Sequence, residues 1–221
     1  MTDSPFRPFE THLDRDTALN ILKNTLIGAD DGELFLERCQ SEVISFDDGR
    51  LRTSSFDAAE GFGLRAVQGE TVGYAHSTEV SEQAMRRATG TVRLAIGAGG
   101  GSMAPAPQAT NQKLYSDHNP LSDSTFPAKI DILREIDAYA RGLDRRVVQV
   151  TATIAASHQE VVILRTDAPD VSDSRPMVRM NVSIIVEQDG QRQTGYVGGG
   201  GRYGLNGMLE PTHWRPLVRE A

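Results

Sequence analysis

The sequence predicts an α+β protein in which antiparallel β-meanders pack against helices. Segments with helical periodicity are separated by segments with strand alternation, and Asp-Gly pairs mark turns between neighbouring strands. An antiparallel meander exposes one face, so its other face must be covered by the neighbouring helices. The order is helix, meander, helix, linker, helix, meander, which is compatible with two similar helix-plus-meander halves.

A first helix is predicted over residues 16–27. Asp14 or Asp16 can cap its start, because a short side-chain oxygen accepts from the free amides of the first turn. Gly28 can end it with a left-handed residue. The core-facing stripe would be formed by residues at helical spacing, namely Ala18, Leu19, Leu22, Leu26 and Ile27.

The meander of the first half is marked more clearly by its turns than by its strands. Residues 47–50, Asp-Asp-Gly-Arg, carry a strong two-residue hairpin signal. Further turns are predicted at residues 60–61 and 68–70, a spacing that favours three or four short strands. A second helix is then predicted over residues 82–96, with Ser81 as its N-cap.

A Gly/Pro-rich stretch divides the chain. We expect a first unit at residues 1–96, a loop or linker at 97–113, and a second unit at 114–205. The second unit should hold a helix at 127–143, followed by strands at 148–154, 161–164 and 177–187 and an Asp-Gly hairpin turn at 188–191.

Two further features concern the organisation of the chain. The turn, strand and Gly-Tyr of residues 68–74 resemble those of residues 189–196, which supports a weak internal repeat or reflects only that hairpins are alike. Residues 206–221 read as the start of an amphipathic helix with Trp214 and Val218 on one side. Because the pattern has no stop signal, we expect this helix to lead into a missing catalytic domain.

Composition excludes several classes of protein. The 23 basic and 30 acidic residues give a net charge of −7, which argues against direct binding of nucleic acid. No apolar run is long enough to span a membrane, and the first residues lack a signal-peptide core, so we expect a cytoplasmic protein without a membrane partner. The one cysteine, Cys39, fits a reducing compartment and is expected to be buried and inert.

No catalytic or metal-binding residue is predicted in this chain. A catalytic zinc site usually needs two histidines one helical turn apart, whereas the five histidines are widely spaced and none is followed by glutamate. The glycine run at residues 97–101 lacks the lysine and following helix of a phosphate-binding loop. We therefore expect the five histidines to be solvated or hydrogen-bonded rather than bound to a metal.

A second glycine run gives the candidate binding site. Gly198, Gly199, Gly200 and Gly201 follow a predicted strand, and Arg202 comes next. Glycines let the chain turn sharply or let another backbone approach closely, and a peptide laid along a strand edge needs such access. We therefore predict that these five residues bind substrate. Binding of a small ligand by the glycine-rich ends is a weaker alternative.

Several segments carry a family resemblance that covers nearly the whole chain in order. Residues 33–88, with Phe-Asp-Asp-Gly-Arg and Gly-Phe-Gly-Leu-Arg-Ala-Val, closely resemble the N-terminal region of the TldD branch of the TldD/PmbA family. So do Leu114–Leu121, Lys129–Arg141 and Arg175–Val186. The chain resembles only the N-terminal half of such a protein.

The resemblance implies a function that the residues alone do not. Family members resemble zinc metallopeptidases, once called modulators of DNA gyrase, that cleave unfolded or short peptides. Their His-Glu-x-x-x-His motif, which holds the zinc cofactor, lies in the C-terminal half and has no counterpart here. The resemblance also implies a TldE/PmbA-like partner subunit or a homodimer. We therefore expect an inactive N-terminal domain, or alternatively a binding module that pairs with a TldE/PmbA-like partner.

Overall fold

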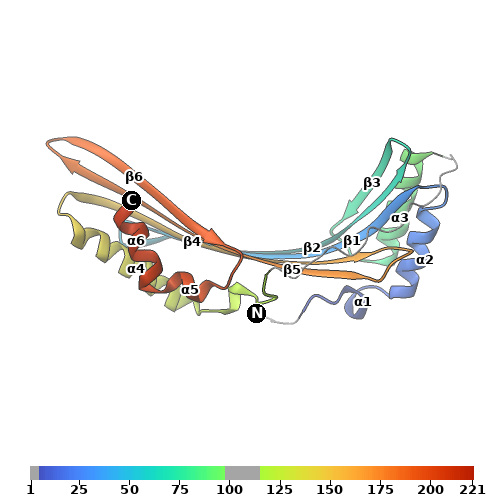
Figure 1. Cartoon of the computed structure of the whole chain (residues 1–221), viewed down its shortest axis with the longest axis horizontal. Helices are drawn as coiled ribbons and strands as arrows, with labels where there is room; N and C mark the ends of the chain where they lie inside the picture. Colours follow the sequence, from blue (N-terminus) through green and yellow to red (C-terminus); the bar gives the residue numbers. More distant parts are fainter. Residues whose placement is uncertain (1–4, 98–114) are drawn as a thin grey trace.

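The computed structural model describes residues 5–97 and 115–221, which form one six-stranded antiparallel sheet with helices against it (Figure 1). The strand order is β3-β2-β1-β4-β5-β6. The strands are β1 Asp31–Asp47, β2 Arg50–Gln68, β3 Thr71–Ser77, β4 Val147–Leu164, β5 Val171–Gln188 and β6 Gln191–Gly201. The helices are α1 Pro8–Thr11, α2 Arg15–Thr25, α3 Glu82–Ile96, a 3-10 turn at Pro120–Ser122, α4 Phe126–Leu143, α5 Leu205–Leu209 and α6 Pro211–Glu220.

The two predicted meanders join into a single sheet. Strands β1, β2 and β3 form one meander and β4, β5 and β6 form the other, and β1 pairs with β4 from Leu34 opposite Leu164 to Asp47 opposite Thr151. The α+β class predicted from sequence is confirmed. The Gly/Pro-rich segment between the meanders lies outside the described residues from residue 98 to residue 114.

Both Asp-Gly hairpins form where the sequence predicts them. Asp48 and Gly49 have φ of 49° and 75°, and Asp189 and Gly190 have φ of 52° and 79°. Positive φ at both central residues gives the turn that matches the twist of the flanking strands. The helix predicted over 82–96 is found at those bounds, and the Ser81 hydroxyl caps it by accepting from the amide of Ala84 at 3.1 Å.

The turn predicted at Glu60-Gly61 is wrong, because both residues lie inside β2, where Gly61 pairs with Glu37. A β-carbon at Gly61 would stand 2.7 Å from the carbonyl oxygen of Ser77. Gly61 therefore allows the end of β3 to pack closely against β2. A glycine that serves this purpose inside a strand looks the same in the sequence as a glycine in a turn. The short strands predicted at 148–154 and 161–164 are likewise one strand, β4.

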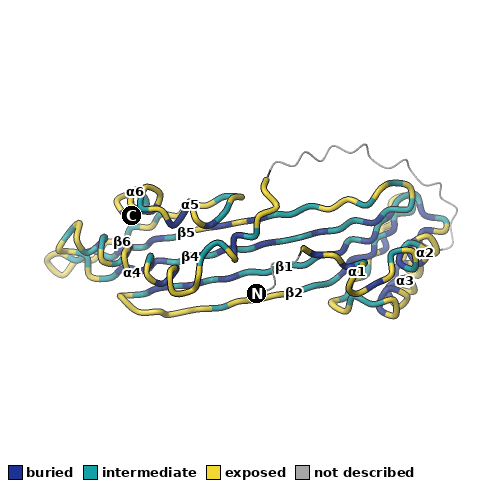
Figure 2. Tube along the Cα trace, turned by 90° about the horizontal axis from the view of Figure 1, so that it is seen from below, coloured by how far each residue is buried: buried dark blue, intermediate teal, exposed yellow. Residues whose placement is uncertain are grey.

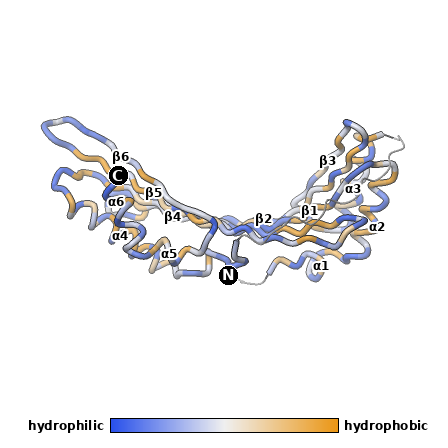
Figure 3. Tube along the Cα trace, viewed as in Figure 1, coloured by the Kyte–Doolittle hydropathy of each residue, from blue (hydrophilic) through white to orange (hydrophobic). Residues whose placement is uncertain are grey.

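Two hydrophobic cores lie at opposite ends of the sheet, and Figure 3 shows the apolar segments gathered there around a paler middle. Helices α2 and α3 cover one end, where Leu22, Met85 and Val92 pack on Leu34 and Leu64. Helices α4, α5 and α6 cover the other end, where Leu133 of α4 and Trp214 of α6 pack with Ile44 of β1, Ile154 of β4 and Met180 of β5.

Both helix groups lie on the same face of the sheet, which is its convex side in Figure 1. Even-numbered residues of β1 enter both cores, whereas its odd-numbered residues are only half-buried. The concave face is therefore left without a helical layer among the described residues. Figure 2 shows the resulting alternation of buried and partly buried positions along the strands.

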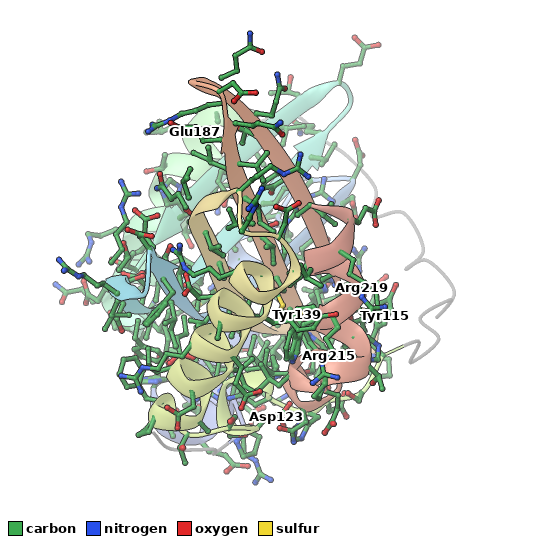
Figure 4. The ribbon with its side chains drawn as sticks, turned by 90° about the vertical axis from the view of Figure 1, so that its left-hand side faces the viewer. Tyr115, Asp123, Tyr139, Glu187, Arg215 and Arg219 are labelled. Carbon is green, nitrogen blue, oxygen red and sulfur yellow. The ribbon has the colours of Figure 1, made fainter. Side chains whose placement is uncertain are left out.

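The helix layer at the C-terminal end is fixed by polar and aromatic contacts as well. The Lys129 ammonium group, on α4, donates to the carboxylate of Glu42 on β1 at 2.5 Å, although Lys129 is only 1% exposed. Tyr139 meets Trp214 edge to face at 5.5 Å, and Arg215 and Arg219 lie over the Tyr139 ring between α4 and α6 (Figure 4). None of the described helices is both long and apolar enough to cross a membrane.

Candidate functional site

The predicted glycine run lies in β6, which is an edge strand of the sheet. Gly198 pairs with Asn181 of β5, and the register continues to Gly201 opposite Val178. Within the described residues no strand pairs with the outer side of β6, so its outward amide and carbonyl groups are open to another extended chain.

Atoms of the same chain already fill the space that a side chain would need at most of these glycines. A β-carbon at Gly198 would overlap Oδ1 of Asn181, and one at Gly200 would overlap the carbonyl oxygen of Val178. By contrast, a β-carbon at Gly199 would meet Leu217 of α6 only at 3.5 Å, an ordinary contact. Close intramolecular approach thus accounts for Gly198 and Gly200. Access for a ligand along the edge of the strand stays a prediction.

Asn181 organises the polar surface beside the glycines. Its Oδ1 accepts from the hydroxyl of Tyr196 at 2.9 Å and from Nε of Arg179 at 2.8 Å. Arg179 has no carboxylate partner among the described side chains, and Tyr196 is 61% exposed. This end of the concave face therefore presents a guanidinium group, an amide and an aromatic ring, which can contact the backbone and the aromatic or acidic groups of a peptide.

Arg202 lies just past the end of β6. Its guanidinium group stacks over the ring of Tyr115 at 5.2 Å from the centroid. This contact fixes the side chain against the segment that leads to α4. The structure therefore places all five predicted residues in or next to one strand, but it gives Arg202 a stacking partner of its own.

A second polar site, which was not predicted from the sequence, is a hollow of about 340 Å³ on the convex face between the two helix groups. His158, which is 4% exposed, contacts the hydroxyl of Ser174 through Nε2 at 2.7 Å. Glu160 accepts from Arg38 at 2.5 Å and from the amide of Phe6 at 2.9 Å. The N-terminal segment is thus anchored across the middle of the sheet.

A pattern in the strands could have revealed this hollow. In β1 the inward positions run Leu34, Leu36, then Arg38, Gln40 and Glu42, and then Ile44 and Phe46. In β4, His158 and Glu160 are the inward residues at the same level. Polar side chains that interrupt an alternating apolar row indicate a gap between two cores, because buried polar groups need partners.

Cys39 lies in the middle of the concave face, where it pairs with Ala59 of β2 and with Gln159 of β4. Burial raises the pKa of the Cys39 thiol, and the carboxylate of Glu37 raises it further. A thiol with a raised pKa is a poor nucleophile at neutral pH. Cys39 is only partly buried, so the prediction of a buried cysteine is wrong, whereas the raised pKa of its thiol agrees with the expectation that it is inert.

The described residues do not fit a zinc site. They contain no group of three or more His, Cys, Asp or Glu side chains arranged to hold a metal ion. His118 and His158 both line the hollow on the convex face, but their contacts are with Asp123 and Ser174, and His12 contacts Glu60.

Solved structures establish the class to which the fold belongs. A crystal structure of a modulator of DNA gyrase from Bacteroides thetaiotaomicron superposes with a TM-score of 0.69 at 12% identity, over 93% of this chain and 49% of that one. A second, from Thermotoga maritima, gives 0.67 at 13% identity over 93% and 46%. TldE from Thermococcus kodakarensis gives 0.60 at 15% identity over 92% and 46%. The chain has the modulator-of-gyrase fold.

Sequence comparisons establish the family. Residues 32–95 match the model of PmbA/TldA metallopeptidase domain 1, and residues 119–221 match that of the PmbA/TldA metallopeptidase central domain. A metalloprotease TldD homolog of Haemophilus influenzae is 32% identical over 90% of this chain, and one of Buchnera aphidicola from Acyrthosiphon pisum is 30% identical over 81%. The chain belongs to the TldD/PmbA metallopeptidase family. It spans 42% and 38% of the lengths of these two relatives.

Proposed function

We propose that this chain is the N-terminal, non-catalytic part of a TldD-like zinc metallopeptidase that cleaves unfolded or short peptides. The observation that carries the proposal is the match of two successive family domains to a chain that lacks the His-Glu-x-x-x-His motif. In a complete peptidase that motif would hold a zinc ion, which would activate water for attack on a peptide bond. The residues present here would act on the peptide before that step.

The contribution that this chain makes is to bind and orient an extended peptide. The outer edge of β6, next to Gly198 and Gly200, offers backbone groups to which a peptide can add as a further strand. Arg179, Asn181 and Tyr196 lie on the adjoining concave face and would contact alternate side chains of the peptide. Strand addition depends on hydrogen bonds to the main chain of the peptide, so it selects unfolded chains, whose main-chain groups are accessible, and excludes folded proteins.

Hydrogen exchange tests the peptide-binding role. An unstructured peptide added to the purified chain should slow amide exchange over Tyr196–Tyr203. The edge strand β3, Thr71–Ser77, is the internal control and should not change, because it lies at the opposite side of the sheet. Protection that is unchanged across Tyr196–Tyr203, or that rises equally in β3, would count against specific binding at β6.

The alternative function is a binding module that pairs with a TldE/PmbA-like subunit. The structural likeness to TldE of Thermococcus kodakarensis favours it, because subunits that share a fold can associate through equivalent surfaces. Co-purification with a TldE-like subunit, in the absence of any peptide effect on β6, would favour this function. A coding sequence after codon 221 that includes His-Glu-x-x-x-His would favour the peptidase instead.

A further inference from the structure

Arg179 differs from other arginines on the concave face of the sheet. Four of these each contact a neighbouring carboxylate, namely Arg65, Arg165, Arg175 and Arg192. Arg179 is exposed, and among the described residues its polar contact is an amide oxygen, Oδ1 of Asn181, which accepts from Nε at 2.8 Å. The chain has a net charge of −7, yet none of its described carboxylates pairs with this group. The Arg179 guanidinium group is therefore available to a carboxylate of another molecule.

Two glycines of β6 make room for the Arg179 side chain. Gly200 pairs with Arg179 and Gly198 pairs with Asn181, so both glycines face the concave side. A β-carbon at Gly198 would lie 3.1 Å from Nη2 of Arg179, and one at Gly200 would lie 3.2 Å from Cβ of Arg179. The Arg179 side chain therefore starts on β5 and reaches over β6, so that its guanidinium group lies towards the open edge of the sheet.

Asn181 holds the guanidinium group in this orientation. Its Oδ1 accepts from Nε of Arg179 and, at 2.9 Å, from the hydroxyl of Tyr196, which lies on β6 on the same face as Gly198. A guanidinium group carries its N–H donors in one plane, so the bond through Nε leaves those on Nη1 and Nη2 for a ligand. Two of these donors can bind one carboxylate side by side.

A peptide strand on the outer edge of β6 would bring its side chains within reach of these donors. Alternate side chains of an added strand point to the concave side. The β-carbon of the peptide residue opposite Gly198 would lie about 4.5–5.5 Å from the position that a β-carbon would take at Gly198 itself. Nη2 of Arg179 lies 3.1 Å from that same position. A carboxylate on an aspartate or glutamate at this place can therefore meet the guanidinium group, whereas a lysine there would be repelled.

We propose that Arg179 makes the β6 edge selective for peptides that carry an acidic side chain opposite Gly198. The inference rests on the proposed function, because it needs a peptide paired with β6. Arg179 is the residue that contacts the acidic side chain, and Asn181 is a positioning residue that acts through Arg179. Main-chain pairing alone would accept any extended chain, so the acidic side chain also fixes which peptide residue lies opposite Gly198.

Peptides that differ at one central residue test the selectivity in the whole chain. The three peptides share an unstructured sequence, are acetylated and amidated at their ends, and carry Glu, Gln or Lys at the centre. Fluorescence anisotropy should give a dissociation constant for the Glu peptide about fivefold below that for the Gln peptide, which is the upper end for an exposed ion pair. The Lys peptide should bind more weakly than the Gln peptide. The preference for Glu should shrink as salt is added.

Variants of the chain assign the preference to Arg179. Arg179→Gln should bring the ratio of the Gln and Glu dissociation constants to about one. Asn181→Asp should do the same, because it keeps the oxygen that accepts from Arg179 and Tyr196 but adds a charge that neutralises the guanidinium group. Arg192→Gln is the matched control, since it removes a positive charge from the same strand face but one that already pairs with Glu187, and it should keep the fivefold ratio.

Hydrogen exchange with the same peptides separates failure of this inference from failure of the proposed function. Slower exchange over Tyr196–Tyr203 with equal dissociation constants for the Glu and Gln peptides would overturn the selectivity and leave peptide binding at β6 standing. No protection with any of the peptides would overturn both. An Arg179-dependent advantage that appears only for a Gln peptide with a free C-terminus would assign the carboxylate to the chain end and overturn the role of an acidic side chain.

Discussion

The buried ion pair between Lys129 and Glu42 allows a quantitative test of how α4 is held on the sheet. Lys129 is 1% exposed, and its ammonium group donates to Glu42 at 2.5 Å and to the carbonyl oxygen of Leu121 at 3.4 Å. Replacing only one partner leaves the other charge buried without compensation, which costs about 3–5 kcal/mol. We therefore predict that Lys129→Met lowers the free energy of unfolding by about 3 kcal/mol.

Removing both charges should have a very different effect. Methionine and leucine at these two positions keep the volume and create no unpaired group, so Lys129→Met/Glu42→Leu should lie within about 1 kcal/mol of the native chain or be more stable. For a chain of this size, 3 kcal/mol corresponds to a change in melting temperature of roughly 6–12 °C. Urea unfolding followed by circular dichroism measures both variants. A double variant as unstable as Lys129→Met, or a single variant that loses less than about 1 kcal/mol, would show that the buried charges do not depend on each other in this way.

Three further predictions concern the glycine run, the acid limb of stability and a helix cap. Gly200→Ala should cost about 1–3 kcal/mol because its β-carbon meets the backbone of Val178, whereas Gly199→Ala should be nearly neutral, and chemical unfolding compares the two. Hydrogen bonds from Gln149 and Thr151 lower the pKa of Asp47 below its usual 3.8, so the unfolded chain binds a proton at this carboxylate more tightly than the folded chain does. The ionised carboxylate of Asp47 therefore stabilises the fold fully above about pH 4, and this stabilisation is lost as the pH falls. Melting temperatures between pH 5 and pH 2 should therefore fall less steeply in Asp47→Asn, and parallel curves would contradict the assignment. Ser81→Ala should cost about 1 kcal/mol through loss of the α3 cap, and Ser81→Asp should restore most of it.

Local signals predicted much of the fold correctly. Asp-Gly pairs at 48–49 and 189–190 identify their hairpins because few residues tolerate positive φ at two successive positions. The helix at 82–96 is marked by its cap and its periodicity. The lengths of β1, β2 and β4 were not predictable in the same way. Gly61 and the polar centre of β4 interrupt the alternation of apolar residues, although pairing with neighbouring strands continues the strand through these positions.

The candidate site was predictable only in part. Four successive glycines indicate a special backbone environment, but sequence could not show that Asn181 and Val178 occupy the space above Gly198 and Gly200. The hollow around His158 depends on the pairing of β1 with β4, two strands separated by about half the chain. Such long-range pairing leaves no local sequence signal, although the inward polar residues of each strand mark where the two cores separate.

Zinc content and peptide hydrolysis of the purified 221-residue chain show whether this chain carries a catalyst of its own. We predict that the chain, incubated with zinc and then dialysed, retains far less than one equivalent of zinc and does not cleave an unfolded protein substrate. The same chain should still bind peptide at β6. Stoichiometric zinc together with zinc-dependent cleavage, abolished by a chelator and restored by zinc, would contradict the claim that its catalyst lies elsewhere.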